Sequence, residues 1–385
     1  MGRILVGKGH VVTIFASSFH HYLLRDLRLQ PGEKWKTESV EGVRFVWLRT
    51  PPYRGNTWRR LVNILVYSWR ALRVGGKLRE KPDVIIGTCA HVFAPLSAYL
   101  LSLLKGGRFF YEVADLWPQT LVDMGALGER DLITFFLRWL EKFLFRKAEK
   151  IISFLPDVQD YVCGMGLPGS KVVWIPNGAD LLRFQGMPPY QGGNSESFTV
   201  MYLGGHARYH KLDVALGAAE ILQKEGKKNI RFVFVGDGAE KPRLVEHARR
   251  IGLRNVEFRS LVPKSDVCKV MGEADALLFC YRRMNVLKYG TSPIKIFDYL
   301  CSGRPIIYAH EASNAIIEEA KAGMTVPPEN PEAMARAIAR LSELGVEERI
   351  AMGKNGLEYV RRNHDIRLLT DRLEACLLPS TNTRL

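Results

Sequence analysis

The chain has little cysteine and no long apolar run. Its six cysteines are scattered over 385 residues and form no C-x-x-C pair, which argues against a disulfide framework or a structural zinc site and for reduced thiols. The longest apolar stretch, residues 92–104, contains Pro95 and is shorter than the roughly 20 residues that cross a bilayer. No secretory signal is recognisable. These absences predict a cytoplasmic protein that is soluble or peripheral to a membrane.

Acidic residues are also too few to balance the basic ones, 40 against 55, and the net charge of +15 predicts an anionic partner. Within residues 53–81, only Glu80 opposes eight lysines and arginines. Residues 59–77 have helical periodicity, and one face would carry four basic residues: Arg59, Arg70, Arg73 and Lys77. The alternative is that Gly75 and Gly76 end the helix first. This pattern resembles an interfacial helix on anionic lipid at the inner face of the cell membrane, and a solvated outer face is the alternative. Nucleic acid is not expected, because no recognition motif accompanies the charge.

Strand-like runs alternate with helical patterns along the chain, which predicts an α/β protein with parallel sheets and helices on both faces. The runs are residues 11–15, 43–48, 84–86, 109–113, 151–154, 172–175, 199–203, 230–235, 256–258, 276–279 and 306–308. A stretch rich in glycine and proline, residues 185–197, interrupts them. We therefore expect two domains, residues 1–188 and 189–354, with a final helical segment, residues 355–385, that crosses back onto the first.

Residues 288–307 are the most informative stretch. A turn at residues 290–293 precedes a short amphipathic helix, with Ser292 as the expected N-cap and Pro293 as the first helical residue. Such a turn aims free backbone N–H groups and the positive end of a helix dipole at one point, which suits an anion such as a diphosphate. Taken alone, the pattern is also that of an ordinary α/β unit.

Two glycine-rich loops follow strands in the second half of the chain. Gly204 and Gly205 precede Arg208 and Lys211, and the next strand ends in a Gly-Asp-Gly step at residues 236–238. Loops at the carboxyl ends of parallel strands are where open α/β sheets bind ligands. Each loop by itself is more typical of a simple turn than of a ligand site.

In the first half, Asp115 follows a strand and is a candidate acid, base or sugar ligand, with a helix N-cap as the alternative. His91 is a second candidate, although a lone histidine more often packs or caps. No H-E-x-x-H motif, carboxylate cluster or Cys/His set is present, so no protein-bound metal is expected.

Together these motifs resemble those of glycosyltransferase family 4, whose members have the GT-B fold of two facing Rossmann-like domains. The most specific matches are residues 115–118 (Asp-Leu-Trp-Pro), 175–178 (Ile-Pro-Asn-Gly), 236–238 and 292–305. The first and last of these are similar to the bacterial branch that builds O-antigens and capsules, including the fucosamine transferases. The resemblance implies transfer of a sugar from a nucleotide donor, uridine-linked by expectation, to a lipid-linked or saccharide acceptor. It also implies retention at the anomeric carbon and no metal or other cofactor.

The resemblance further implies a donor site in the second domain, with the diphosphate near the first glycine loop and the ribose at Asp298. The expected donor-site residues are Gly204, Gly205, Arg208, Lys211, Gly236, Gly238, Arg259, Lys288, Gly290, Thr291, Ser292, Lys295 and Asp298. The catalytic candidates are Asp115, His91 and Lys211. Membrane or acceptor contacts are expected from Arg59, Arg70, Arg73 and Lys77.

The chain departs from the family pattern at four places. Gly290 stands where the family usually has a sugar-contacting glutamate, which leaves the donor sugar unassigned. Ile294 and Ala114 replace the usual asparagine and the usual arginine or histidine. Residues 9–15 resemble the second strand of the family, so residues 3–8 would be the tail of its first helix and the first strand would be absent. The alternative is that residues 3–6 are themselves the first strand.

Two other functions stay open on these residues. Nucleotide-sugar epimerases share the double Rossmann architecture, so the fold does not fix the reaction. A truncated relative that binds nucleotide sugar without turnover is the non-enzymatic alternative.

Overall fold

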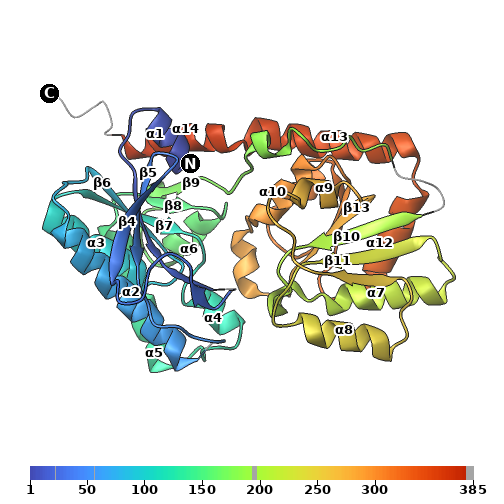
Figure 1. The fold of residues 1–385 in the computed structure, drawn as a ribbon, viewed down its shortest axis with the longest axis horizontal. Coiled ribbons are helices and arrows are strands. Elements are labelled where there is room, and N and C mark those ends of the chain that lie inside the picture. The colour runs from blue at the N-terminus through green and yellow to red at the C-terminus, as the bar shows by residue number, and fades with distance from the viewer. Residues whose placement is uncertain (22, 56, 193–196, 379–385) are drawn as a thin grey trace. The chain divides into compact units, whose positions relative to one another are not determined.

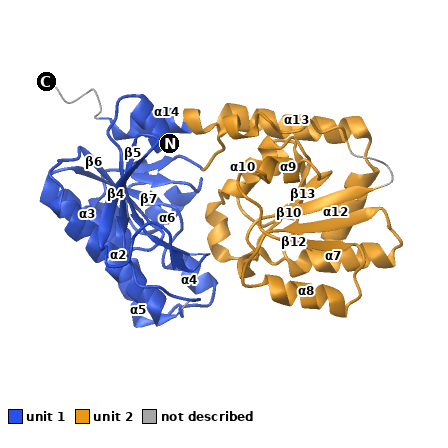
Figure 2. Cartoon of the chain, in the orientation of Figure 1, with its two compact units in different colours: residues 1–176, 369–385 blue, residues 177–368 orange. Residues whose placement is uncertain are grey.

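The computed structural model describes residues 1–21, 23–55, 57–192 and 197–378, and these form two compact units (Figure 1, Figure 2). Unit 1 contains residues 1–176 and the chain from residue 369 onward, and unit 2 contains residues 177–368. The expected junction lay at residues 188 and 189. Residues 177–188 pack with unit 2 instead, because Ala179 and Phe184 are buried in its core. Of the expected linker, residues 193–196 lie outside the described residues.

Unit 2 is built on a six-stranded parallel sheet in the order β12-β11-β10-β13-β14-β15. Its strands are β10 (Phe198–Leu203), β11 (Ile230–Val235), β12 (Val256–Arg259), β13 (Ala276–Cys280), β14 (Ile306–Ala309) and β15 (Gly323–Val326). Its helices are η2 (Leu181–Phe184), η3 (Arg208–His210), α7 (Asp213–Lys224), α8 (Lys241–Arg250), α9 (Val267–Met271), η4 (Asn285–Tyr289), α10 (Ile294–Cys301), α11 (Ile316–Glu319), α12 (Pro331–Glu343) and α13 (Val346–Asn363). Strands β13 and β14 are buried throughout, as expected where helices cover both faces of a parallel sheet.

Unit 1 contains a four-stranded parallel sheet, β6-β7-β8-β9, a three-stranded sheet, β1-β5-β4, and a hairpin, β2-β3. The strands are β1 (Thr13–Ser17), β2 (Phe19–His20), β3 (Arg25–Asp26), β4 (Trp35–Val40), β5 (Val43–Leu48), β6 (Val84–Thr88), β7 (Arg108–Val113), β8 (Ile151–Ser153) and β9 (Val172–Trp174). The helices are α1 (Gly2–Gly7), α2 (Trp58–Lys77), α3 (Phe93–Lys105), α4 (Gln119–Asp123), α5 (Leu132–Lys147), α6 (Val158–Gly164), η1 (Gly169–Lys171) and α14 (Ile366–Leu377). The predicted α/β class with parallel sheets is confirmed.

The first residues are helical, so the alternative that residues 3–6 form a strand is wrong. Helix α1 begins with Met1 O accepting the N–H groups of Ile4 and Leu5. Met1 and Leu5 pack against a core of Phe110, Ile152 and other buried residues, and this apolar face favours the helix. The strand that follows, β1, pairs in parallel with β5.

The last helical segment, expected as one element, is two helices separated at His364 and Asp365. The backbone of Ala179 is hydrogen-bonded to the residues on both sides of this interruption. Its carbonyl oxygen accepts from Ile366 N and its N–H donates to His364 O, each at 3.0 Å. Beyond it, Leu369 and Leu373 of α14 are buried in the core of unit 1. The chain therefore returns to the first unit from residue 369, later than the expected residue 355.

One buried carboxyl in unit 1 makes the stability of the fold depend on pH. Glu141 of α5 accepts a hydrogen bond of 2.6 Å from the Tyr161 hydroxyl, and burial raises its pKa from 4.5 to about 8. Because the folded pKa is the higher one, the folded state keeps a proton that the unfolded state loses between these two values. The contribution of Glu141 to the free energy of unfolding therefore falls by about 1.4 kcal/mol per pH unit in that window.

We expect Glu141→Gln to remove this fall, because the amide does not titrate. The measurement is the melting temperature of both proteins from about pH 5 to about pH 9. The wild-type melting temperature should drop more steeply than that of the variant, and parallel curves would contradict a raised pKa at Glu141.

Candidate functional site

The two glycine loops of unit 2 lie against each other at the carboxyl ends of β10 and β11. Gly204 N donates to Val235 O at 2.9 Å, and His206 N donates to Asp237 O at 2.8 Å. An ideal Cβ placed on Gly236, whose φ is +137°, would lie 2.1 Å from Gly204 O. Only glycine allows so close an approach of two backbones at this φ. The loops therefore form one surface with main-chain atoms at its centre.

Lys295 of α10 places its ammonium group on this surface. Its Nζ donates to the Tyr202 hydroxyl at 2.9 Å and lies 4.5 Å from the Tyr202 ring centre and 4.8 Å from that of Phe279. It is so close to Gly204 that a Cβ there would lie 2.2 Å away. No carboxylate pairs with it among the described residues, and burial lowers its pKa to about 7. A desolvated cation without a counter-ion is suited to bind an anion.

Two buried histidines pack beneath this surface, and neither was expected from the sequence as a site residue. His206 is fully buried under the second glycine loop, and neither ring nitrogen has a hydrogen-bond partner in the described structure. His210 Nδ1 lies 2.8 Å from Gly205 O and 2.9 Å from the Tyr202 hydroxyl. Burial lowers the pKa of His206 to about 4 and that of His210 to about 3, so both rings are neutral at pH 7. The available signal was the position of His206 directly after the paired glycines, with His210 four residues later.

The turn at residues 290–293 differs from the expected anion site. Gly290 N donates to Leu287 O and Thr291 N to Asn314 Oδ1, so these two amides are not free for a ligand. Ser292 is not the N-cap: its Oγ accepts the N–H of Asn177 at 2.9 Å, and Asn177 Nδ2 donates to Ser292 O. Helix α10 begins one residue later than expected, at Ile294. Long-range partners that a sequence window does not contain account for the difference.

Asp298 lies in the middle of α10 with its Oδ1 free of hydrogen bonds and 3.8 Å from Arg183 Nη1. Burial raises its pKa above the ordinary value, against the opposing effect of Arg183. A buried carboxylate oxygen without a donor is an acceptor for a ligand hydroxyl. This geometry suits the ribose contact that the resemblance implies.

The other expected donor-site residues differ in whether their charged groups are exposed or already paired within the protein. Arg208 is exposed in η3, and Lys211 is half-buried with a left-handed φ of +45°. Lys288 is exposed, with its Nζ 4.9 Å from the Tyr289 ring centre. Arg259 is held by Glu257 and Glu273, so its guanidinium is already neutralised within the protein. Lys295 therefore lies at the glycine loops, whereas Arg259 is paired with carboxylates of the protein and is not available to a ligand phosphate.

Comparisons with known proteins identify the family of the chain. Residues 1–178 match the family model described as glycosyl transferase 4-like domain, and residues 197–344 match glycosyl transferases group 1. The chain belongs to glycosyltransferase family 4. A relative is WcaI of Escherichia coli strain K12, assigned as a glycosyl transferase of colanic acid biosynthesis, which is 22% identical over 94% of this chain and 90% of its own length.

Solved structures of other glycosyltransferases share the GT-B fold. Sucrose-phosphate synthase from Thermosynechococcus elongatus superposes with a TM-score of 0.75 at 17% identity, over 98% of this chain and 91% of that one. HepE of Anabaena, solved with UDP and glucose, has a TM-score of 0.66 at 14% identity, over 88% and 86%. The family assignment does not favour the epimerase alternative. No helix within the described ranges is long and apolar enough to cross a membrane.

In unit 1 of this glycosyltransferase, Asp115 and His91 follow the neighbouring parallel strands β7 and β6. Asp115 is not a helix N-cap, since Pro118 has that position before α4. Desolvation of the carboxyl by the surrounding protein raises the pKa of Asp115 to about 6, although the residue as a whole is exposed. His91 Nδ1 accepts the Ala94 N–H at 3.2 Å, so the ring caps the first turn of α3, and burial lowers its pKa to about 4.

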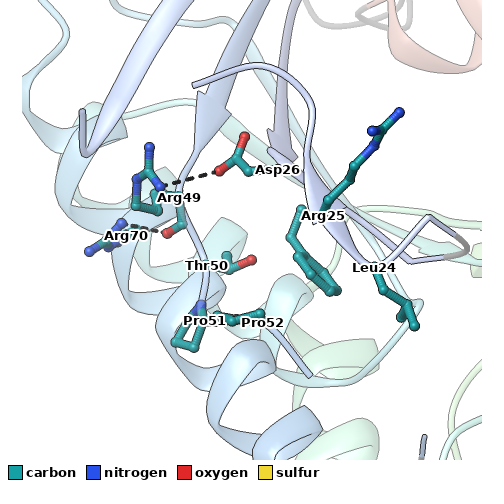
Figure 3. Close-up of a pocket in the computed structure, with 9 residues that line it drawn as sticks. Leu24, Arg25, Asp26, Arg49, Thr50, Pro51, Pro52 and Arg70 are labelled. Carbon is teal, nitrogen blue, oxygen red and sulfur yellow. Dashed lines mark hydrogen bonds and ion pairs between the residues drawn. The ribbon is translucent and has the colours of Figure 1, made fainter. Parts of the chain in front are cut away.

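Unit 1 also contains a cavity of about 320 Å³ beyond the ends of β1 and β5 (Figure 3). Asp26 lies 3.6 Å from Arg49, and Arg70 donates to the main-chain oxygen of Arg49; all three residues line the cavity. Arg70, expected on the basic face of α2, is therefore engaged with the backbone of its own domain. The other three basic residues of that set, Arg59, Arg73 and Lys77, are exposed.

Proposed function

We propose that this glycosyltransferase moves a sugar from a UDP-linked donor to a lipid-linked or saccharide acceptor during synthesis of a surface polysaccharide. We further propose that it retains the anomeric configuration and acts at the inner face of the cell membrane. The proposal assigns donor binding to unit 2 and acceptor binding to unit 1. The name of WcaI supports the polysaccharide role, and the complex of HepE with UDP supports the nucleotide.

The observation that carries the proposal is the buried Lys295 ammonium beside the paired glycine loops. A diphosphate placed there would meet a cation that has no carboxylate partner among the described residues. In such a site, charge that develops on the leaving phosphate is stabilised by groups already in position. The proposal gives this role to Lys295 with Arg208 and Lys211, rather than to a metal, and gives the ribose to Asp298.

Calorimetric titration with UDP tests the donor site. We expect saturable binding to the wild type and about tenfold weaker binding to Asp298→Ala, because a charge-assisted hydrogen bond to a ribose hydroxyl is lost. Asp266→Ala, an exposed carboxylate of the same unit, is the matched control and should bind like the wild type. Binding of GDP or ADP in preference to UDP would overturn the choice of nucleotide.

Release of UDP from UDP-sugars in the presence of a membrane extract then separates a transferase from a protein that only binds. Turnover that depends on the extract supports the proposal. Tight UDP binding without turnover for any sugar tested would favour the binding-only alternative.

A further inference from the structure

Unit 1 exposes many large apolar side chains on three neighbouring helices. Helix α3 packs against both α2 and α5, and the three lie along one side of the unit (Figure 1). Together they carry twelve of the 27 large apolar side chains that are exposed among the described residues, whereas all of unit 2 carries five. Contiguous apolar surface of this kind on a folded protein marks an interaction site.

On α2 the exposed apolar residues form one stripe. Trp58, Leu61, Leu65 and Trp69 follow each other at spacings of three, four and four, which places them on one face of the helix, and each is at least 44% exposed. Other faces of the helix are used for packing: Val74, opposite the stripe, is buried, and Gly75, on its flank, lies against Leu101 of α3. The stripe is therefore additional to the core-facing side of α2.

Aromatic rings continue the surface from α5 onto α3. The rings of Phe136 and Trp139 are stacked, as are those of Trp139 and Phe143, and Phe143 contacts Tyr99 of α3 edge-on at 5.6 Å. Trp139 is 61% exposed and Leu103, one turn beyond Tyr99, is 64% exposed. Exposed tryptophan and phenylalanine side chains are typical of helices that lie at the polar–apolar boundary of a bilayer.

The charges around this surface are almost all positive. Helix α2 contains no Asp or Glu, and the only acid in α5, Glu141, is buried. Arg59 lies over the Trp58 ring, Arg73 over Trp69 and Lys147 over Phe143, at 5.0 to 5.7 Å from the ring centres. A basic side chain stacked on an exposed aromatic ring presents its charge at the edge of an apolar patch. Anionic headgroups above an apolar layer are the partner with the complementary arrangement.

We propose that the outer face of α2, α3 and α5 docks this protein onto an anionic lipid bilayer. The apolar stripe and the aromatic rings enter the headgroup boundary, and Arg59, Arg73, Lys77 and Lys147 contact the lipid phosphates. From the sequence only the basic face of α2, with Arg70, was expected at a membrane. The folded chain adds α3 and α5 to this surface, and Arg70 is engaged with the backbone of its own domain. This inference rests on the proposed function, because it names the surface at which the enzyme would meet a lipid-linked acceptor. Binding to lipid can nevertheless be measured without any enzymatic turnover.

The test is sedimentation of the full chain with vesicles of phosphatidylglycerol and phosphatidylethanolamine, and with vesicles of phosphatidylcholine alone. The face variant replaces Leu61, Leu65 and Leu103, which are 49%, 44% and 64% exposed, with serine. The control variant replaces Leu23, Leu27 and Leu261, which are 48%, 43% and 65% exposed outside the face. Both variants lose the same apolar groups from surface positions, so both should fold.

We expect binding to the anionic vesicles only, weakened by salt, and a loss of about tenfold or more in the face variant but not in the control. Equal losses in both variants, or no binding of the wild type, would overturn the proposal. Wild-type dimers that the face variant fails to form would assign the face to a second copy instead. UDP titration of the face variant keeps the two proposals separate, because its donor affinity should be unchanged whichever way the vesicles decide.

Discussion

Lys295→Met is expected to lower the affinity for UDP by about 10- to 100-fold and to abolish turnover without lowering the melting temperature. Methionine keeps the apolar stem that packs beside Tyr202 and Phe279 and removes only the ammonium. In the free protein that ammonium is desolvated and has no carboxylate partner among the described residues, so it destabilises the fold. The variant should therefore lose UDP affinity and turnover while its melting temperature stays the same or rises. The measurements are calorimetric titration, an activity assay and a melting curve.

The same lysine should make donor binding depend on pH. Because its pKa is about 7 in the free protein, much of the population is neutral above that value and must take up a proton when the diphosphate binds. UDP affinity should thus fall as the pH rises above about 7 in the wild type but not in Lys295→Met. Lys224→Met, an exposed lysine of α7, is the control and should behave like the wild type. Full activity of Lys295→Met would remove this residue from the donor site.

Patterns within one window of sequence predicted the elements of the fold well. The eleven predicted strand runs all correspond to strands, because buried parallel strands such as β13 are continuous apolar runs. Strand β4 was missed, since its residues are mostly exposed and include Lys36 and Glu38. Strand β15 was missed because Gly323 begins it and only four residues form it.

Contacts between distant segments were the part that the sequence could not predict. The amide of Thr291 bonds to Asn314 and the hydroxyl of Ser292 to Asn177, so a turn that looks open in sequence is largely satisfied in the fold. Helix α2 runs through Gly75 and Gly76 to Lys77 because Gly75 fits against Leu101, a residue 26 positions away. The position of Lys295 beside Gly204 likewise depends on how α10 packs next to β10.

The exposed aromatic face was missed for a related reason. Helical periodicity marks two apolar sides on α5 but does not say which of them is buried. The structure buries Leu137, Leu140 and Leu144 and leaves Phe136 and Trp139 at the surface. An apolar residue in a sequence is expected in the core by default, so a surface that departs from this default can be recognised only from the folded chain.

Gly236→Ala should produce the largest effect of any single methyl group in the donor site. The new Cβ would lie 2.1 Å from Gly204 O. The backbone of residue 236 fixes the position of this Cβ, and the oxygen is a main-chain atom, so neither can rotate away. The two glycine loops must separate by about an ångström, which moves Gly204 relative to Lys295. Displacements of this size at a catalytic site cost on the order of 100-fold in rate. We expect that loss in turnover, with a lower melting temperature.

Gly226→Ala is the control that distinguishes the steric clash at residue 236 from the strain of a side chain in left-handed backbone. Gly226 also has a left-handed φ, +75°, but an added Cβ there meets nothing within 4 Å. Both variants therefore carry the cost of about 1–2 kcal/mol for a side chain in left-handed backbone, and only Gly236→Ala carries the steric clash. If turnover fell equally in both, general destabilisation would explain the loss and the close approach of the loops would have no special role. A loss confined to Gly236→Ala would show that contact between the two loop backbones is what positions the donor.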